Sequence, residues 1–192
     1  MGILSPEWDG RIGHWIRTLE ADFYEPLGAV EFKAFRTRDH LMYGELDQAE
    51  FVPAPPGFTW GFTWEYCWFL GDIILPERAA GKRIVLDLKP GGESTLFVNG
   101  QEFGTYRADW VAKAHHYLVD NTIARNAKQG TCCRIAMETY AGHDFPDCGS
   151  CATGPVLPGS YTFGEHEGSR RRLGASTFGI WREEAYQLYM DV

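Results

Sequence analysis

Export signals, membrane spans and N-glycosylation triplets are all absent from this sequence of 192 residues. Its first fifteen residues carry acids and glycines where a secretory signal has a continuous apolar segment, and no apolar run approaches the length of a membrane span. The five cysteines form an odd set, which gives no simple framework of disulfides. We therefore expect a protein of the reducing cytoplasm that has no membrane as a partner.

Positive charge is also scarce. Lys and Arg number 18 against 26 Asp and Glu, which gives a formal net charge of −8. Phosphate backbones are bound by clustered Lys and Arg, so this balance argues against a nucleic acid as partner. The basic cluster Arg170–Arg172 follows a Gly-Ser pair, and we interpret it as part of a solvated loop.

Residues 64–104 predict a β-sandwich, because short runs rich in aromatic and β-branched residues alternate there with turn residues. The pair Asn99-Gly100 tolerates the positive φ angles of a tight hairpin. We expect strands at residues 29–41, 63–75, 83–89, 94–98, 101–106, 115–119 and 132–140, and none in the proline-rich residues 51–57. The alternation predicts that the inward-facing residues include Trp68, Ile73, Ile84, Leu86, Leu96, Val98, Ile135 and Met137.

A helix is expected before the sandwich. Ser5-Pro6-Glu7 suits a helix start, and apolar residues then recur at spacings of three and four as far as about Ala21. The last run, residues 181–192, also carries large apolar side chains. Because neither segment is expected to complete a two-sheet core, we predict that together they dock another domain through the rings of Trp8, Trp15, Trp181, Tyr186 and Tyr189.

The order of four short pieces carries a family resemblance: Trp68-Phe69, Leu75-Pro76, a turn at Gly81-Lys82, and Phe97–Gly100. The chain resembles the galactose-binding-like jelly rolls that accompany glycoside hydrolases. More specifically, it resembles the domain that precedes the catalytic domain in α-mannosidases of glycoside hydrolase family 38. The resemblance extends to residues 138–142, which read Glu-Thr-Tyr-Ala-Gly.

Sugar-binding domains of β-galactosidases and β-glucuronidases share some of these pieces. Two features favour the mannosidases: the long amphipathic segment before the sandwich, and the absence after Gly104 of the Gly-Gly-Tyr-x-Pro-Phe type of sequence that marks the β-galactosidase group. A stand-alone carbohydrate-binding module, or a sugar-binding domain of the β-galactosidase or β-glucuronidase type, remains the alternative.

The resemblance implies a mostly-β jelly-roll sandwich with an N-terminal helix, acting as a non-catalytic scaffold for the catalytic domain of the same polypeptide. That domain would use zinc or another divalent metal to hydrolyse α-mannosides, whereas the family's His-x-His-x-Asp motif does not occur in this sequence. We expect a helical lead-in at 1–28, the sandwich at 29–140, a Gly/Pro-rich insertion or linker at 141–175, and a segment at 176–192 that leads to the catalytic domain. Glycans and a second copy of the chain are further candidate partners.

Two groups of residues are candidates for binding. Trp60 and Trp64 suit a platform for the apolar face of a sugar, although alternate aromatic residues that enter a strand also build cores. His143, Cys148, Cys151 and His166 are the nearest approach to a zinc site, and Cys148 and Cys151 also suit a reversible disulfide, but the favoured interpretation is an ordinary loop with free thiols. Cys132 and Cys133 are expected to fill the core.

No catalytic residue is predicted. A glycosidase needs two carboxyl groups held on either side of a sugar in a cleft. Glu183-Glu184 reads as the solvated face of a helix-like run, and Asp144 and Asp147 suit turns.

Overall fold

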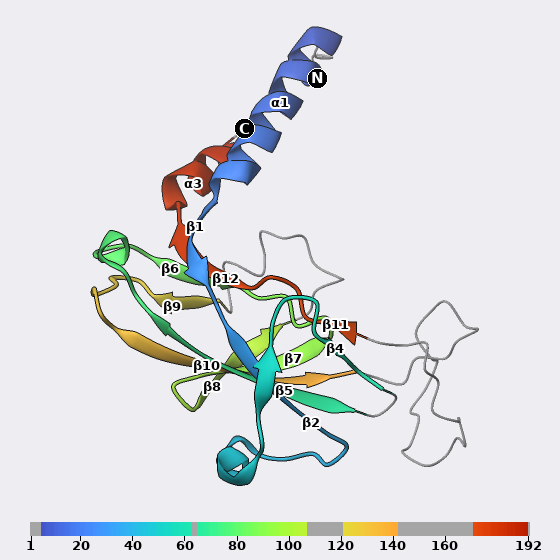
Figure 1. Ribbon diagram of the computed structural model, residues 1–192. Coiled ribbons are helices and arrows are strands. Elements are labelled where there is room, and N and C mark those ends of the chain that lie inside the picture. The colour runs from blue at the N-terminus through green and yellow to red at the C-terminus, as the bar shows by residue number, and fades with distance from the viewer. Residues whose placement is uncertain (1–4, 63–64, 107–120, 142–170, 192) are drawn as a thin grey trace, which may run out of the picture.

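Two antiparallel sheets face each other in the computed structural model, which describes residues 5–62, 65–106, 121–141 and 171–191 (Figure 1). One sheet has the order β1 (Tyr24–Ala29), β12 (Thr177–Trp181), β6 (Ile84–Asp87), β9 (Thr122–Ala124). The other has the order β3 (Val52–Ala54), β2 (Phe32–Thr37), β5 (Tyr66–Ile74), β10 (Cys132–Tyr140), β7 (Glu93–Val98), β8 (Gln101–Tyr106). A short pair joins β4 (Thr59–Trp60) to β11 (Arg171–Arg172). The predicted mostly-β sandwich is confirmed.

The main core lies between the two sheets. Strand β6 contributes Ile84 and Leu86, and the facing sheet contributes Phe69, Leu96 and Ile135, all of which are almost completely buried. Side chains alternate between the faces of a strand, so one apolar set per strand suffices to fill this layer. The predicted inward residues Ile73, Ile84, Leu86, Leu96, Ile135 and Met137 lie in this core, and Val98 packs against it.

The predicted orientation of Trp68 is wrong. Trp68 is buried on the opposite face of the six-stranded sheet, together with Leu46 and Ala136. Ile73 lies five positions after Trp68 on the same strand. Because side chains alternate between the two faces, an odd offset places these two residues on opposite faces. The short 3₁₀ helix η1 (Tyr43–Gln48) supplies Leu46 and Tyr43, which cover Trp68 on what we call the outer face of this sheet.

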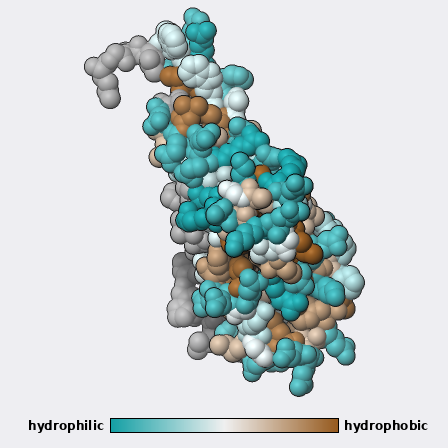
Figure 2. Space-filling view, turned by 90° about the vertical axis from the view of Figure 1, so that its left-hand side faces the viewer, coloured by the Kyte–Doolittle hydropathy of each residue, from teal (hydrophilic) through white to brown (hydrophobic). Residues whose placement is uncertain are grey.

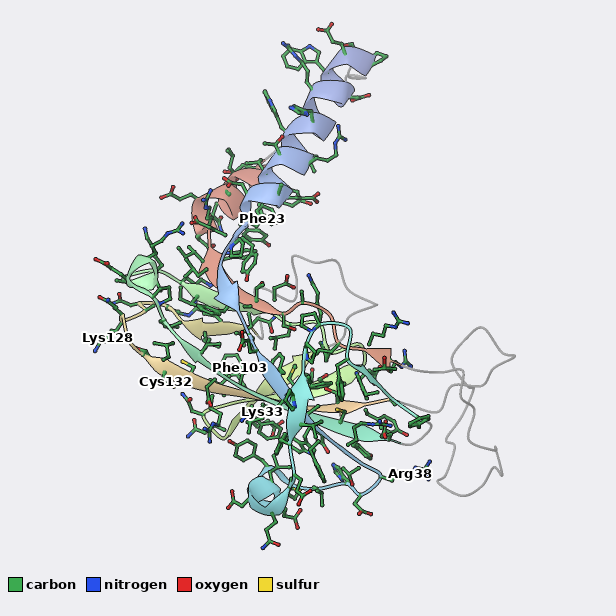
Figure 3. The ribbon with its side chains drawn as sticks, viewed as in Figure 1. Phe23, Lys33, Arg38, Phe103, Lys128 and Cys132 are labelled. Atoms are coloured by element: carbon green, nitrogen blue, oxygen red, sulfur yellow. The ribbon has the colours of Figure 1, made fainter. Side chains whose placement is uncertain are left out.

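The hairpin between β7 and β8 turns at the expected pair. Asn99 and Gly100 have φ angles of 52° and 80°, which suit a tight turn between antiparallel strands. The side-chain oxygen of Asn99 also accepts a hydrogen bond of 2.9 Å from the backbone N–H of Arg134 on the neighbouring strand β10. The predicted strand at 132–140 has the expected bounds. Its first residue, Cys132 (Figure 3), is exposed, so the expectation that it fills the core is wrong. Cys133 is buried.

Three expected segments differ from the structure. The strand expected at 29–41 is two strands in two sheets: β1 ends at Ala29 and β2 begins at Phe32. The proline-rich residues are not free of strands, because β3 pairs with β2 at the edge of the six-stranded sheet, where a proline is tolerated. Finally, β12 lies between β1 and β6 and places Phe178 in the core, so residues 177–181 are part of the sandwich. The strand expected at 115–119 lies outside the described residues.

A helical arm projects from the sandwich (Figure 1). Helix α1 (Pro6–Asp22) begins at the expected proline, and α3 (Glu183–Asp191) packs beside its base. A second short 3₁₀ helix, η2 (Glu77–Ala79), follows β5. No residue of α1 is fully buried. Among the described helices, none is long and apolar enough to cross a membrane.

The base of this arm is held by a cluster of rings around Phe23, which lies where α1 ends (Figure 3). The Phe23 ring centroid lies 5.6 Å from that of Trp181, 5.5 Å from Tyr186 and 5.2 Å from Tyr189. Trp181 is only 3% exposed, so the expectation that its ring is part of a free docking surface is wrong. By contrast, Trp8 and Trp15 are 49% and 53% exposed on the outer part of α1.

Candidate functional site

A hollow of about 360 Å³ opens at one end of the outer face of the six-stranded sheet. The pairing of strands β5, β10, β7 and β8 brings its side chains together. Trp68 lies opposite Glu138, Glu138 opposite Thr95, and Thr95 opposite Thr105. Two residues further along β5 and β10, and so on the same face, Tyr66 lies opposite Tyr140. Side chains at paired positions point to the same face, so these neighbours form a continuous lining beside the apolar cluster around Trp68.

Aromatic rings form one wall of the hollow. The rings of Tyr66 and Tyr140 lie 4.9 Å apart with an interplanar angle of 30°. The imidazole of His40 stacks on Tyr66 at 5.3 Å, and its Nε2 atom lies 3.1 Å from Oε1 of Glu138. His40 is 63% exposed in this contact and Glu138 only 13%, so the carboxyl group lies at the floor and the imidazole at the rim.

Burial changes the acid–base properties of this lining. It raises the pKa of Glu138, an effect that the neighbouring His40 opposes. Burial, with a smaller contribution from Tyr66, raises the pKa of Tyr140 to about 12. The pKa of Tyr66 is raised by burial and then by the nearby Glu138 carboxylate. Both phenols therefore stay protonated at neutral pH and can donate hydrogen bonds.

The structure places Trp60 away from this site. The Trp60 side chain is 1% exposed, packs edge-on against Phe69 at 5.7 Å, and donates from Nε1 to the carbonyl oxygen of Pro90 at 3.0 Å. Its ring therefore has no exposed face on which a sugar could stack. Trp64 lies outside the described residues, as do Asp144, Asp147 and all four residues of the candidate zinc site, namely His143, Cys148, Cys151 and His166.

Glu183 has a structural environment. Its carboxylate accepts from Arg83 at 2.7 Å and from Nε1 of Trp181 at 3.0 Å, and Gln187 donates to the other oxygen. These bonds attach the first turn of α3 to the sandwich and lower the pKa of Glu183. The carboxylate is thus engaged in holding the helix.

Glu65 is a buried carboxylate that sequence reasoning missed. It is 7% exposed and accepts from the backbone N–H groups of Gly61 and Phe62 at 2.7 and 3.0 Å and from Arg36 at 2.8 Å. The Arg36 guanidinium in turn lies over the ring of Phe62 at 4.9 Å. This arrangement holds the backbone of Gly61 and Phe62 beside Glu65. In the sequence Glu65 is a single acid between aromatic residues, which gives no signal of such a role.

The hollow itself was also missed. Alternation along β10 places Glu138 on the face opposite Met137, and that much is readable from the sequence. The signal that would have found the site is the register of β10 with β5 and β7, which places Tyr66 and Thr95 near Glu138. The pattern within one strand does not show how that strand is aligned with strands distant in the sequence.

Comparisons with known proteins agree with the sandwich. A family model described as the jelly roll domain of α-mannosidase matches residues 27–155. Mouse α-mannosidase 2C1 is 33% identical over 73 residues, which cover 38% of this chain and 7% of the mouse protein. Human α-mannosidase 2C1 is 34% identical over 106 residues, which cover 46% of this chain and 10% of the human protein. The matched part of the chain therefore spans a tenth or less of the length of these relatives.

Among solved structures, β-glucuronidase from Ruminococcus gnavus is similar in two complexes. With uronic isofagomine it gives a TM-score of 0.47 at 14% identity, covering 82% of this chain and 28% of the glucuronidase chain. With D-glucaro-δ-lactam it gives a TM-score of 0.45 at 15% identity, covering 83% and 29%. The family match spans more than half of the sequence and takes in β2, β5, β7 and β10 of the six-stranded sheet, whereas β12 lies outside the matched residues. The chain belongs to the family of α-mannosidase jelly roll domains.

Proposed function

We propose that this chain is a non-catalytic domain of a larger cytoplasmic α-mannosidase, in which it supports the catalytic domain of the same polypeptide. The observation that carries this proposal is the match of residues 27–155 to the α-mannosidase jelly roll domain. The curated relatives are about ten times longer than the matched region, which leaves ample chain for a separate catalytic domain. Hydrolysis of α-mannosides and the zinc or other divalent metal that supports it are assigned to that domain.

The helical arm supports a scaffolding role. Arg182, at the start of α3, forms ion pairs with Asp22 at the end of α1 and with Glu25 in β1, and Arg78 pairs with the same Glu25. Together with the rings around Phe23, these contacts attach α1 to the four-stranded sheet at its base. An arm held in this way presents Trp8 and Trp15 in a defined direction.

The exposed part of this arm is the surface we assign to the catalytic domain. Figure 2 shows apolar side chains among polar ones at the helical end of the molecule. Indole rings that are half exposed on a helix are typical of surfaces that become buried on association. We assign the rest of the polypeptide as the partner that covers this surface, because nine tenths of the length of the human relative lie outside the matched region.

The chemistry of the described residues fits this division. The carboxylates of Glu65 and Glu183 accept hydrogen bonds from backbone N–H groups, arginines or an indole of the domain itself. The proposal gives the chain binding and support, and gives bond cleavage to the catalytic domain.

The test has two arms. In the first, the purified chain is incubated with zinc and an aryl α-mannoside, and we expect no release of the chromophore. In the second, the chain is added to human α-mannosidase 2C1 from which the matching region has been removed, and binding is measured by interferometry. We expect binding that is weakened by the double change Trp8→Ser/Trp15→Ser and unaffected by Ile74→Ser, which alters an exposed apolar residue of β5.

Turnover that is abolished by changing one carboxylate of this chain would refute the non-catalytic assignment. Binding that the tryptophan changes leave intact would refute the arm as the docking surface, and the contact would then have to lie on the sheets.

A further inference from the structure

The hollow on the outer face combines rings, hydroxyl groups and a carboxyl group within a few paired positions of one sheet. The scaffolding role gives none of these groups a task, and neither α1 nor α3 contributes a residue to the lining. We propose that this hollow is a binding subsite for one neutral hexopyranose unit of a glycan. The site would be carried by the jelly roll itself and would act independently of the docking arm.

The rings supply the apolar part of such a site. Tyr66 and Tyr140 form a tilted pair, and both are only partly buried, so each keeps some ring surface toward the hollow. A pyranose presents a face of C–H groups that packs on an aromatic ring, and a tyrosine held by its neighbours loses little conformational entropy when it is covered. Tyr66 contacts both His40 and Tyr140, and is therefore preorganised.

The polar groups suit hydroxyls. Thr95 and Thr105 lie opposite one another on β7 and β8, and a threonine hydroxyl can both donate and accept. The Tyr140 hydroxyl stays protonated at neutral pH because its pKa is about 12, and so provides a donor. The Glu138 carboxyl group is an acceptor at the floor, and its Oε1 atom has no hydrogen bond of good geometry despite the nearby His40. A buried acceptor without a bond is costly, so a ligand hydroxyl there would be favourable.

The volume of the hollow and the charge of its lining restrict the class of ligand that could bind there. A volume of about 360 Å³ lies near the lower end of the range of roughly 300–1,000 Å³ for small-molecule sites, which favours a single sugar unit. The described lining includes Glu93 and Glu138 and contains no Lys or Arg. A uronic acid would place its carboxylate beside the Glu138 carboxyl group at the floor, and would be disfavoured by the like charge. A neutral hexose avoids this repulsion.

The experiment is an NMR titration of the intact chain. Backbone N–H signals are followed while methyl α-mannopyranoside is added, and glucuronate is titrated separately as the anionic counterpart. We expect saturable shifts in the millimolar range at residues 93–95, 105 and 138–140 with the mannoside, and at least tenfold weaker binding of glucuronate. Tyr140→Ala and Glu138→Gln are each expected to weaken mannoside binding at least tenfold.

Arg134→Gln is the matched control. Arg134 lies on the same strand and the same face as Glu138, but it pairs with Asp72 at an exposed position. Its replacement should leave the affinity within twofold of the parent. Because Tyr140→Ala could disturb the sheet, Thr105→Val on the exposed strand β8 provides a second variant, and it should weaken binding severalfold without loss of folding.

Two results would overturn the proposal. One is the absence of saturable shifts at the hollow with the mannoside; the other is binding that Glu138→Gln and Thr105→Val leave unchanged in folded protein. Glucuronate that binds as tightly as the mannoside would overturn the assignment of a neutral sugar. None of these results depends on the catalytic domain, so the scaffolding role stands or falls separately.

Discussion

At the scale of single residues, the domain uses its buried polar groups to hold loops. Glu65 is the clearest case, because three hydrogen-bond donors converge on one carboxylate that has almost no contact with solvent. A buried carboxylate is stable only when its charge is satisfied in this way. The exposed pair Asp72–Arg134 has good geometry too, with distances of 2.9 and 3.2 Å, but both partners are about half exposed to water.

Replacing Glu65 by Ala should therefore destabilise the domain far more than breaking the exposed pair. The change removes a charged acceptor and leaves the N–H groups of Gly61 and Phe62 without it, so we expect a loss of about 3 kcal/mol in the free energy of unfolding. Asp72→Asn is the control and should cost less than about 1 kcal/mol. Urea unfolding followed by tryptophan fluorescence measures both. Equal losses would show that burial adds nothing to the value of the Glu65 contacts.

At the scale of elements, the helical arm and the four-stranded sheet form one structural unit. Strands β1 and β12 approach so closely that a Cβ atom on Gly179 would lie 2.2 Å from the carbonyl oxygen of Glu25, which explains a glycine at this position. Helix α1 leads directly into β1, and β12 leads directly into α3. The rings of Phe23 and Trp181 then seal the junction over Val85 of β6.

Phe23→Ala should loosen this junction. Removing a buried phenyl ring costs about 3–5 kcal/mol through lost burial and the cavity that remains. We also expect faster hydrogen exchange in the amides of α1 and α3, because they lose the ring that joins them. Trp8→Ala, at a half-exposed position on the same helix, should change the free energy of unfolding by less than about 0.5 kcal/mol.

Urea unfolding together with hydrogen exchange followed by mass spectrometry provides the measurement for this junction. If Phe23→Ala and Trp8→Ala had equal effects, the arm would be held by its ion pairs alone, since Arg182 and its partners are unchanged in both variants.

At the scale of the whole molecule, local signals predicted more than long-range ones. The alternation at residues 132–140 and the pair Asn99-Gly100 are local patterns, and the structure has both as expected. The roles of β3 and β12 could not be predicted in this way. β3 is a short edge strand and β12 contains a glycine, and each is stabilised by pairing with a strand that is distant in the sequence. The site depends on the register between β5, β10 and β7, which the sequence does not specify residue by residue.

The exposed arm has a consequence for the assembly state of the isolated chain. The predicted surface of five rings is reduced by the structure to the outer part of α1, since Trp181 is buried and Tyr186 and Tyr189 pack against Phe23. Trp8 and Trp15 lie seven residues apart, two turns along the same helix face. An apolar stripe of this kind lowers its free energy by burial against any complementary surface, including a second copy of itself.

On the proposed scaffolding role, the isolated chain should therefore self-associate through α1, and Trp8→Ser/Trp15→Ser should make it monomeric. The mean mass from light scattering, measured over a series of protein concentrations, should rise toward that of a dimer for the parent and stay constant for the double variant. Ile74→Ser is the control, because Ile74 is 67% exposed on the sandwich and its change should leave the association intact. A parent that stays monomeric at every concentration would show that these two indoles are too small a surface for association. The docking surface for the catalytic domain would then have to include part of a sheet.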